Sequence, residues 1–343
     1  MHGGDTHMLR EIREAPEAVG RQADALRAPL AELVGRLRRQ PPQVAVTCAR
    51  GSSAHAATFG KHLIERYLGI PVAAAAPSVA TVYRQRLRLR DQLFLAISQS
   101  GRSDDLIEQT AAARAAGAVT VALVNATDSP LAETSDIVLP MEAGPELSVA
   151  ATKTFIASAS ALLRLLALWS EDRTMAAALG RLPDRLGTAA DLDWSEALTG
   201  FEAATSLVTI GRGPTLAIAR EASLKLKETC NLHAEAFSGA EFLHGPVALV
   251  DDDYPILMFV PTDAAQAGLL GLSSSLRKKG ASLYAAEPGE AAAGRLPALA
   301  PDHPEADAIC LIQSFYGLAV RLAERRGIDV DRPRHLQKVT RTR

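Results

Sequence analysis

The sequence predicts an α/β protein with two doubly wound parallel-sheet domains in tandem. Two observations over the 343 residues support this fold class: short apolar runs alternate with helical stretches, and each half opens with a strand that leads into a glycine loop and a helix. Strands that alternate with helices are typical of a parallel sheet covered on both faces. In such sheets, ligands bind at the carboxyl ends of the strands.

The first half is predicted to begin with a helical leader over residues 1–38, in which leucines recur on one helical stripe. Residues 39–172 are expected to form the first domain. Its apolar runs, each expected to be a strand, are Val44–Cys48, Val72–Ala76, Leu93–Ile97, Val119–Asn125 and Ile137–Pro140. Helices are expected between most of them, for example over Ser53–Tyr67 and Asp104–Ala116.

The second domain is predicted over residues 190–328, after a more polar stretch in which the alternation pauses. A helix is expected from about Thr215 to Cys230. The strands of this half are expected at Leu207–Ile210, Ile256–Val260 and Ser282–Ala286. Residues 329–343 form a tail, for which the sequence alone leaves two alternatives, a frayed basic terminus or a segment that folds over a site.

Composition excludes several classes of function. The net charge of −2 gives no general attraction to nucleic acid or to a membrane surface. The longest apolar stretch, Phe155–Trp169, is too short to span a bilayer, and the amino terminus lacks the apolar core of a signal peptide. The cysteines are few and far apart, so neither a disulfide framework nor a cysteine-based metal site is expected; they are Cys48, Cys230 and Cys310. A reducing cytoplasm is the predicted setting.

Two hydroxyl-rich loops are predicted to hold a phosphate group. Gly51-Ser52-Ser53 and Ser98-Gln99-Ser100-Gly101 each follow an apolar run, and a helix begins after the second loop at about Ser103. Free N–H groups at a helix start and serine hydroxyls are donors for an anion. The lysine of a triphosphate-binding loop is missing, so neutral donors to a monophosphate are expected. The alternative is that each serine only caps a helix.

Three further features are candidates for the chemistry: one helix face, one histidine and one lysine of the tail. Glu221, Lys225 and Glu228 are spaced to share one helix face, which from spacing alone is a solvated face with an ion pair. Placed beside a cleft, the same residues are a sensible acid–base group. His244 precedes a Gly-Pro turn that can aim its ring, although a surface histidine is an equal alternative. Lys338, in the tail, is a lid, a phosphate partner or an imine former if the tail is ordered.

Taken together, the motifs resemble those of the sugar isomerase (SIS) family, in particular the isomerase half of glucosamine-6-phosphate synthase. The resemblance covers nearly the whole chain, in order. Its motifs, as they stand here, are Gly51-Ser52-Ser53, Ser98-Gln99-Ser100-Gly101, Val149-Ala150-Ala151-Thr152-Lys153, Leu224-Lys225-Leu226-Lys227-Glu228, His233-Ala234-Glu235-Ala236, Glu241-Phe242-Leu243-His244-Gly245-Pro246 and Pro333-Arg334-His335-Leu336-Gln337-Lys338.

The resemblance implies two flavodoxin-like SIS domains and a homodimer. It implies that Glu228 moves a proton between C1 and C2, that His244, donated by the partner subunit, opens the sugar ring, and that Lys338 forms an imine with the open ketose. Phosphate ligands would be Ser52, Ser53, Ser98, Gln99, Ser100 and Ser103. Residues around the reacting carbons would be Val149, Ala151, Glu221 and Lys225. Neither a metal nor a cofactor is expected, because the amine and the carbonyl serve as electron sink.

Three departures from the synthase bear on the activity. The glutaminase domain of the synthase needs a cysteine exposed at the mature amino terminus; the first cysteine here is Cys48, so that domain is not expected. In addition, Ala151 replaces a serine, and the tail continues from Lys338 as Val339-Thr340. The stretch Pro145–Lys153, with the Lys-Val-Thr tail, resembles the stand-alone glucosamine-6-phosphate deaminases of the family. This resemblance implies conversion of glucosamine 6-phosphate to fructose 6-phosphate and ammonia. Alternatives are a phosphosugar aldose–ketose isomerase, a glutamine-independent isomerase of the synthase type, or a non-catalytic sugar-phosphate sensor. The sequence leaves open the exact sugar, the direction of reaction and any allosteric control.

Overall fold

The computed structural model describes residues 6–338. Its internal contacts divide the chain into two compact units, each of which is described by itself. The first unit comprises residues 17–146, 153–179 and 337–338 of the described chain. The second unit comprises residues 6–16, 147–152 and 180–336. The boundary therefore falls within two helices, α1 (His7–Ala25) and α8 (Arg173–Ala190).

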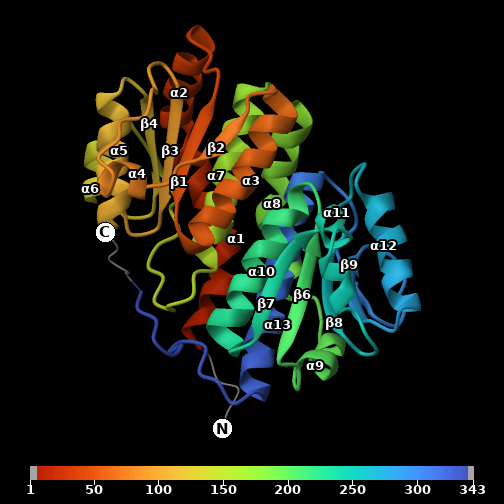
Figure 1. Ribbon diagram of the computed structural model, residues 1–343. Helices are drawn as coiled ribbons and strands as arrows, with labels where there is room; N and C mark the ends of the chain where they lie inside the picture. The colour runs from red at the N-terminus through yellow and green to blue at the C-terminus, as the bar shows by residue number, and fades with distance from the viewer. Residues whose placement is uncertain (1–5, 339–343) are drawn as a thin grey trace. The chain divides into compact units, whose positions relative to one another are not determined.

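The first unit contains a parallel five-stranded sheet in the order β2-β1-β3-β4-β5 (Figure 1). Strand β1 pairs with β2 on one side and with β3 on the other, so the chain reverses its direction of travel across the sheet at β1. The carboxyl ends of β1 and β3 therefore form the topological switch point, where ligands of open α/β sheets bind. The strands are β1 (Ala45–Ala49), β2 (Val72–Ala74), β3 (Leu93–Ser98), β4 (Val119–Val124) and β5 (Ile137–Pro140).

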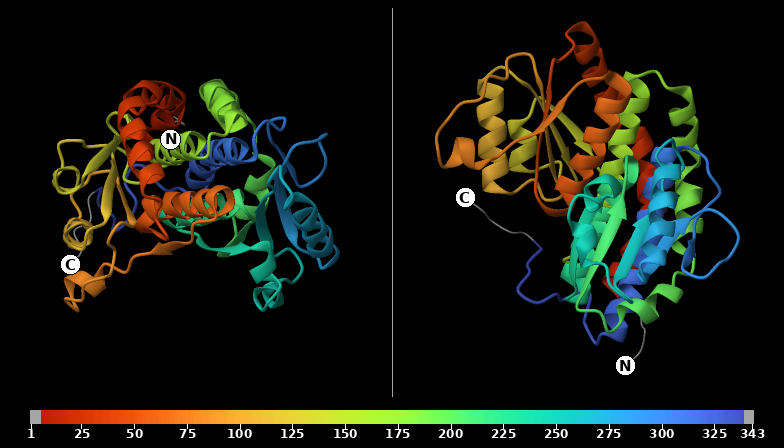
Figure 2. Two further views of the ribbon diagram at one scale, coloured as in Figure 1. Left: turned by 90° about the horizontal axis from the view of Figure 1, so that it is seen from above. Right: turned by 45° about the vertical axis from the view of Figure 1, so that its right-hand side comes forward.

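Helices cover both faces of this sheet (Figures 1 and 2). On one face, apolar residues of α5 and α6 pack against Phe94, Ala96 and Ala122 of the strands. Helix α7 is buried almost all round and packs against α2 and α3, as its continuous apolar sequence predicts. The helices of this unit, besides parts of α1 and α8, are α2 (Arg27–Arg39), α3 (Gly51–Leu68), α4 (Ser78–Thr81), α5 (Asp104–Ala115), α6 (Pro130–Thr134) and α7 (Lys153–Trp169).

The second unit repeats the architecture with a parallel sheet in the order β10-β9-β8-β6-β7. Strand β6 pairs with β7 and β8, so its carboxyl end lies at a second switch point. The strands are β6 (Ser206–Gly211), β7 (His233–Ser238), β8 (Pro255–Phe259), β9 (Ser282–Glu287) and β10 (Arg295–Pro297). The helical segments are α9 (Glu196–Phe201), α10 (Pro214–Cys230), α11 (Gly239–Phe242), the 3₁₀ turn Pro246–Leu249, α12 (Gln266–Lys278) and α13 (Pro304–Arg325).

The amino-terminal segment of α1 is bound to the far end of the chain within this second unit. The Asp331 carboxylate accepts hydrogen bonds from the N–H groups of His7, at 2.7 Å, and Met8, at 2.9 Å. The Gln313 side-chain amide of α13 donates to the carbonyl oxygen of Ile12 at 2.8 Å. Helix α13 is long and apolar enough to cross a membrane by composition, but 83% of that apolar window is buried inside the protein, as in a core helix.

The predicted fold class is confirmed: the chain forms two parallel sheets with interleaved helices. The eight strands expected from apolar runs are present, with ends shifted by a few residues. Strands β7 and β10 were missed. In β7, Ala234 is buried between exposed His233 and Glu235, so this edge strand has no apolar run, and β10 has only three residues. The domain boundaries expected at residues 38, 172, 190 and 328 remain predictions.

Candidate functional site

The two hydroxyl-rich loops lie at the switch point of the first unit. Strands β1 and β3 pair in register from Ala45 with Leu93 to Ala49 with Ile97, so the loops that follow them emerge at the same edge of the sheet. Ser52 and Ser53 lie in the first turn of α3, whereas Ser103 directly precedes α5. The Ser103 hydroxyl makes no capping hydrogen bond, so helix capping does not account for this serine.

Serines of the second loop also shape the loop itself. The buried Ser98 Oγ accepts a hydrogen bond from the N–H of Gly101 at 3.1 Å, and Ser100 Oγ accepts from the N–H of Arg102 at 3.3 Å. The carbonyl oxygen of Gln99 accepts from the N–H of Asn125 at 3.2 Å, which connects the loop to the end of β4. The backbone at Gln99 and Ser100 is therefore held in place from both sides, while both side chains remain partly exposed.

The backbone conformation and the close packing at position 101 require a glycine. Its φ of +62° lies in the left-handed region, and a Cβ added there would lie 2.0 Å from Ser129 Oγ. The carbonyl oxygen of Gly101 also accepts from the N–H of Leu131 at 3.1 Å. The loop after β3 thus packs directly against the start of α6, without room for a side chain.

The expectation of neutral donors alone overlooked Arg50. This residue directly precedes Gly51, and its Nη2 atom lies 2.8 Å from Oδ2 of Asp105, a buried residue in the first turn of α5. The ion pair joins the loop after β1 to the loop after β3. Sequence reasoning missed both residues because they are 55 positions apart and neither belongs to a recognisable spacing pattern.

In the second unit, Glu221, Lys225 and Glu228 share one face of α10, but this face is not solvated. The side chains of Glu221 and Lys225 are fully buried, and only Glu228, with 21% of its side chain exposed, reaches the surface. Lys225 Nζ lies 3.5 Å from Glu221 Oε1 and donates a hydrogen bond to Glu228. The interpretation favoured by spacing alone, a solvated face with one ion pair, is therefore wrong.

A single buried ammonium group thus faces two carboxylates. The Tyr316 hydroxyl of α13 lies 3.5 Å from Glu221 Oε1 and donates to it. Glu221 thus contacts two buried groups, the Tyr316 hydroxyl and the Lys225 ammonium group. Lys225 also fixes the carboxylate of Glu228 by a hydrogen bond. A carboxylate that is fixed by a buried cation and still reaches the surface is suited to accept and return a proton.

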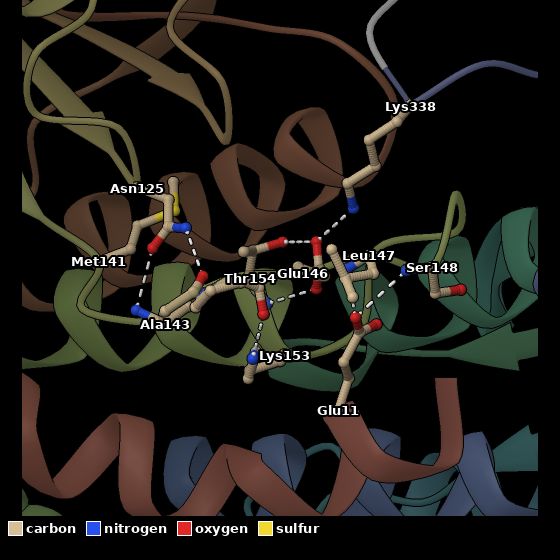
Figure 3. Close-up of polar contacts among 12 residues, drawn as sticks. Glu11, Asn125, Met141, Ala143, Glu146, Leu147, Ser148, Lys153, Thr154 and Lys338 are labelled. Atoms are coloured by element: carbon tan, nitrogen blue, oxygen red, sulfur yellow. Dashed lines mark hydrogen bonds and ion pairs between the residues drawn. The ribbon is translucent and has the colours of Figure 1, made fainter. Parts of the chain in front are cut away.

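The remaining candidates of the second unit lie on separate elements. Val149 and Ala151 belong to the segment Leu147–Thr152 and are partly exposed. Glu11 Oε1 accepts hydrogen bonds from the N–H groups of Leu147 and Ser148, which fixes the backbone of this segment (Figure 3). His244 is exposed in the turn after α11, and its N–H donates to the carbonyl oxygen of Glu241 at 2.9 Å.

Lys338 is ordered in the first unit and contacts a residue that sequence reasoning did not single out. Its Nζ atom donates a hydrogen bond of 2.8 Å to Oε2 of Glu146 (Figure 3). Glu146 is buried and also accepts from Thr154, through the N–H at 3.0 Å and the hydroxyl at 2.8 Å. A frayed terminus therefore does not describe residue 338. Val339 and Thr340, which distinguished the tail from that of the synthase, lie outside the described residues.

Over residues 6–338, no cluster of three or more histidine, cysteine, aspartate or glutamate side chains is arranged to hold a metal ion. All three cysteines are buried. Burial raises the pKa of the Cys48 thiol to about 12, of Cys230 to about 11 and of Cys310 to about 12. These thiols are protonated at neutral pH and are poor nucleophiles.

The fold and the two loops at its switch point define a protein of the SIS class. A family model described as "SIS domain" matches residues 42–168 and 201–285, and the chain belongs to this family. The isomerizing glutamine–fructose-6-phosphate aminotransferase of Symbiobacterium thermophilum is 34% identical to it over 368 residues, which cover 98% of this chain and 59% of that enzyme. The chain thus spans somewhat more than half the length of this curated relative.

Solved structures agree with this assignment. A protein of Silicibacter pomeroyi, provisionally described as a phosphosugar isomerase, superposes with a TM-score of 0.90 at 47% identity, over 95% of this chain and 100% of that one. The C-terminal domain of glucosamine-fructose-6-phosphate aminotransferase from Francisella tularensis gives a TM-score of 0.84 at 27% identity, over 96% and 99%. These relatives support an isomerase-type enzyme of the SIS family.

Proposed function

We propose that this chain converts glucosamine 6-phosphate and water to fructose 6-phosphate and ammonia, by an aldose–ketose proton transfer followed by hydrolysis. The observation that carries the proposal is the arrangement on α10, where the buried Lys225 holds the carboxylate of Glu228 by a hydrogen bond and the Glu228 side chain stays partly exposed. An enzyme that moves a proton between adjacent carbons needs one such fixed base. A protein that only binds a sugar phosphate has no need of it.

The phosphate group of the substrate is assigned to the loops of the first unit. Main-chain N–H groups at the start of α3 and serine hydroxyls supply neutral donors, which suit a monophosphate. Arg50 adds a cation at the same edge of the sheet, although its charge is balanced by Asp105. The proposed ligands are Ser52, Ser53, Ser98, Gln99, Ser100 and Ser103.

The proposed reaction proceeds in three steps that balance. His244 assists ring opening, which gives the free aldehyde of the amino sugar. Glu228 removes the proton from C2 and returns it to C1, and a second proton passes from the amino nitrogen to O1. The C1 carbonyl thereby becomes a hydroxymethyl group while C2 becomes an imine. Water adds to C2, the carbon–nitrogen bond breaks, and ammonia leaves with fructose 6-phosphate as the other product.

The remaining assignments follow the same proposal. Val149 and Ala151 would line the sugar, and Glu221 and Lys225 would act behind Glu228, since both are fully buried. Lys338 would supply an amine that forms an imine with the open-chain ketose. We further propose a cytoplasmic homodimer in which His244 serves the partner subunit, with neither nucleic acid nor membrane as a partner.

The test is an assay of ammonia release from purified protein incubated with glucosamine 6-phosphate, with fructose 6-phosphate measured in parallel. Equal amounts of both products are expected. Turnover of fructose 6-phosphate or a related phosphosugar without ammonia would replace the deaminase by an aldose–ketose isomerase. Thermal stabilisation by several sugar phosphates without any turnover would leave a sensor as the function.

A further inference from the structure

The contact between Lys338 and Glu146 differs from an ordinary surface ion pair. Glu146 has no exposed side-chain surface, whereas Lys338 keeps 24% of its own. The cation therefore comes from the tail, and the anion belongs to the interior of the first unit. Exposed ion pairs are worth little, but a buried carboxylate that loses its cation is costly.

The site around Glu146 is built to keep this carboxylate charged. Burial on its own raises the pKa of Glu146, but the charge and hydrogen bond of Lys338 and the two donors of Thr154 outweigh burial, so the pKa lies below its usual value. Lys153, at the start of α7, donates from Nζ to the carbonyl oxygen of Pro145 at 2.7 Å. The backbone that leads into Glu146 is thereby fixed as well (Figure 3).

We propose that Glu146 is a positioning residue for Lys338: it binds the tail lysine as an ammonium ion and holds it unreactive until the open-chain ketose is present. This inference rests on the proposed function for the role of Lys338 in imine formation. An imine requires the neutral amine, since the nitrogen lone pair attacks the carbonyl carbon. An ammonium ion hydrogen-bonded to a carboxylate has no such lone pair.

Glu146 retains two donors when Lys338 leaves, because the Thr154 N–H and hydroxyl bonds do not involve the tail. The acceptor site therefore stays formed and able to take the lysine back after each turnover. The segment that follows Asp331 would be restrained at Lys338 in the resting state and released in the reacting state. In this proposal Glu146 acts on the reaction through Lys338 and not by binding the substrate.

The first experiment measures the reactivity of Lys338 in the absence of substrate. Trace labelling with acetic anhydride, followed by mass spectrometry, compares Lys338 with the exposed Lys278 of α12 as internal reference. In Glu146→Gln, relative labelling of Lys338 should rise several-fold, because its nitrogen loses the carboxylate to which it is hydrogen-bonded. Glu133→Gln, an exposed carboxylate of α6 in the same unit, is the matched control and should leave labelling unchanged.

A second pair of variants tests whether the contact between Lys338 and Glu146 restrains the tail, without altering the buried carboxylate. Lys338→Arg keeps the charge but not the nucleophile, whereas Lys338→Met loses both. Limited trypsin cleavage after the exposed Arg334 should be slow in the wild type and in Lys338→Arg, and several-fold faster in Lys338→Met and Glu146→Gln. This comparison remains informative even if Glu146→Gln folds poorly.

The outcomes separate this inference from the proposed function. Unchanged labelling in Glu146→Gln, together with equal cleavage rates in Lys338→Arg and Lys338→Met, would overturn the role of Glu146 even if ammonia is released. Altered labelling and cleavage without any turnover would support the restraint of Lys338 by Glu146 and would reject the proposed deaminase activity. Borohydride reduction with fructose 6-phosphate should trap an adduct on Lys338 in the wild type and in Glu146→Gln, but not in Lys338→Arg.

Discussion

Arg50 and Asp105 connect the two phosphate loops of the first unit through a contact of 2.8 Å between Nη2 and Oδ2. Arg50 lies between β1 and α3, and Asp105 lies in the first turn of α5, the helix that follows β3. The relative position of the two loops therefore depends on one ion pair in addition to strand pairing. An anion that needs donors from both loops depends on that distance.

Removal of this connection should weaken phosphate binding. In Arg50→Met, Asp105 stays buried without its cation, and we expect a loss of about 1–2 kcal/mol in stability, below the range for buried pairs because Arg50 is half exposed. Calorimetric titration with glucosamine 6-phosphate should show weaker binding than the exposed-residue control Arg86→Met. Equal affinities in the two variants would mean that the loops do not need the pair.

Gly101→Ala should distort the loop after β3. The new Cβ would lie 2.0 Å from Ser129 Oγ at a φ of +62°, whereas Gly69, at a φ of +67°, has nothing within 4 Å of its added Cβ. Gly69→Ala therefore reports the backbone strain alone, about 1 kcal/mol. Urea unfolding and ligand titration should both show a larger loss for Gly101→Ala. If the two variants behaved alike, the packing against Ser129 would be unimportant.

Glu228→Gln should abolish proton transfer and leave phosphate binding intact, because the amide cannot accept the C2 proton. General acid–base catalysis typically contributes about 10²- to 10⁴-fold, and a fall of kcat in that range is expected. Exchange of the C2 proton with solvent deuterium, followed by NMR, is the direct measurement. Glu241→Gln, an exposed glutamate of α11, is the control. Undiminished exchange in Glu228→Gln would remove this residue from the mechanism.

Lys225→Met should destabilise the second unit. The substitution leaves the buried Glu221 without the ammonium group 3.5 Å away, and the loss of one partner of a buried pair costs about 3–5 kcal/mol. Chemical unfolding compares this variant with Lys278→Met, which removes an exposed lysine. A difference below about 1 kcal/mol would indicate that Glu221 takes up a proton or finds another cation at little cost.

Glu146 should contribute to acid sensitivity. Its pKa is lowered below about 4.5 in the folded protein, so its stabilising contribution is present above that value and is lost as the pH falls through the lower folded pKa. Wild-type stability should therefore fall more steeply below about pH 4.5 than that of Glu146→Gln, which cannot titrate. Urea midpoints at a series of pH values give the comparison, and parallel curves for the two proteins would contradict it.

Much of the fold was predictable because buried parallel strands are short apolar runs between helices. Strands β4 (Val119–Val124) and β8 (Pro255–Phe259) are examples in which local composition already determines the element. Strand β7 was not predictable in this way, because an edge strand with His233 and Glu235 exposed has only one buried residue in its first half. Pairing with β6, not its own composition, makes it a strand.

The residues of the candidate site were predictable where they belong to a local sequence motif. They were not predictable where a contact between distant positions places them. The serine loops follow strands directly, so their place at the sheet edge follows from topology. Burial of Lys225 between two carboxylates does not follow from helical spacing, which fits a solvated face equally well. Glu146 lies in a stretch that carries the family resemblance, but its contact with Lys338 had no signal in the sequence, because the two residues are 192 positions apart.

The hydrogen bonds from His7 and Met8 to Asp331 have a consequence for synthesis on the ribosome. The two ends of the His7–Asp331 contact are 324 positions apart, so the first helix emerges long before its acceptor exists. At translation rates of about 5–20 residues per second, that interval is roughly 15–65 s. During this time the nascent helix presents Met8 and Ile12, buried in the finished protein, to solvent or to chaperones. The contacts of His7 and Met8 with Asp331 can therefore form only after almost the whole of this chain has been made.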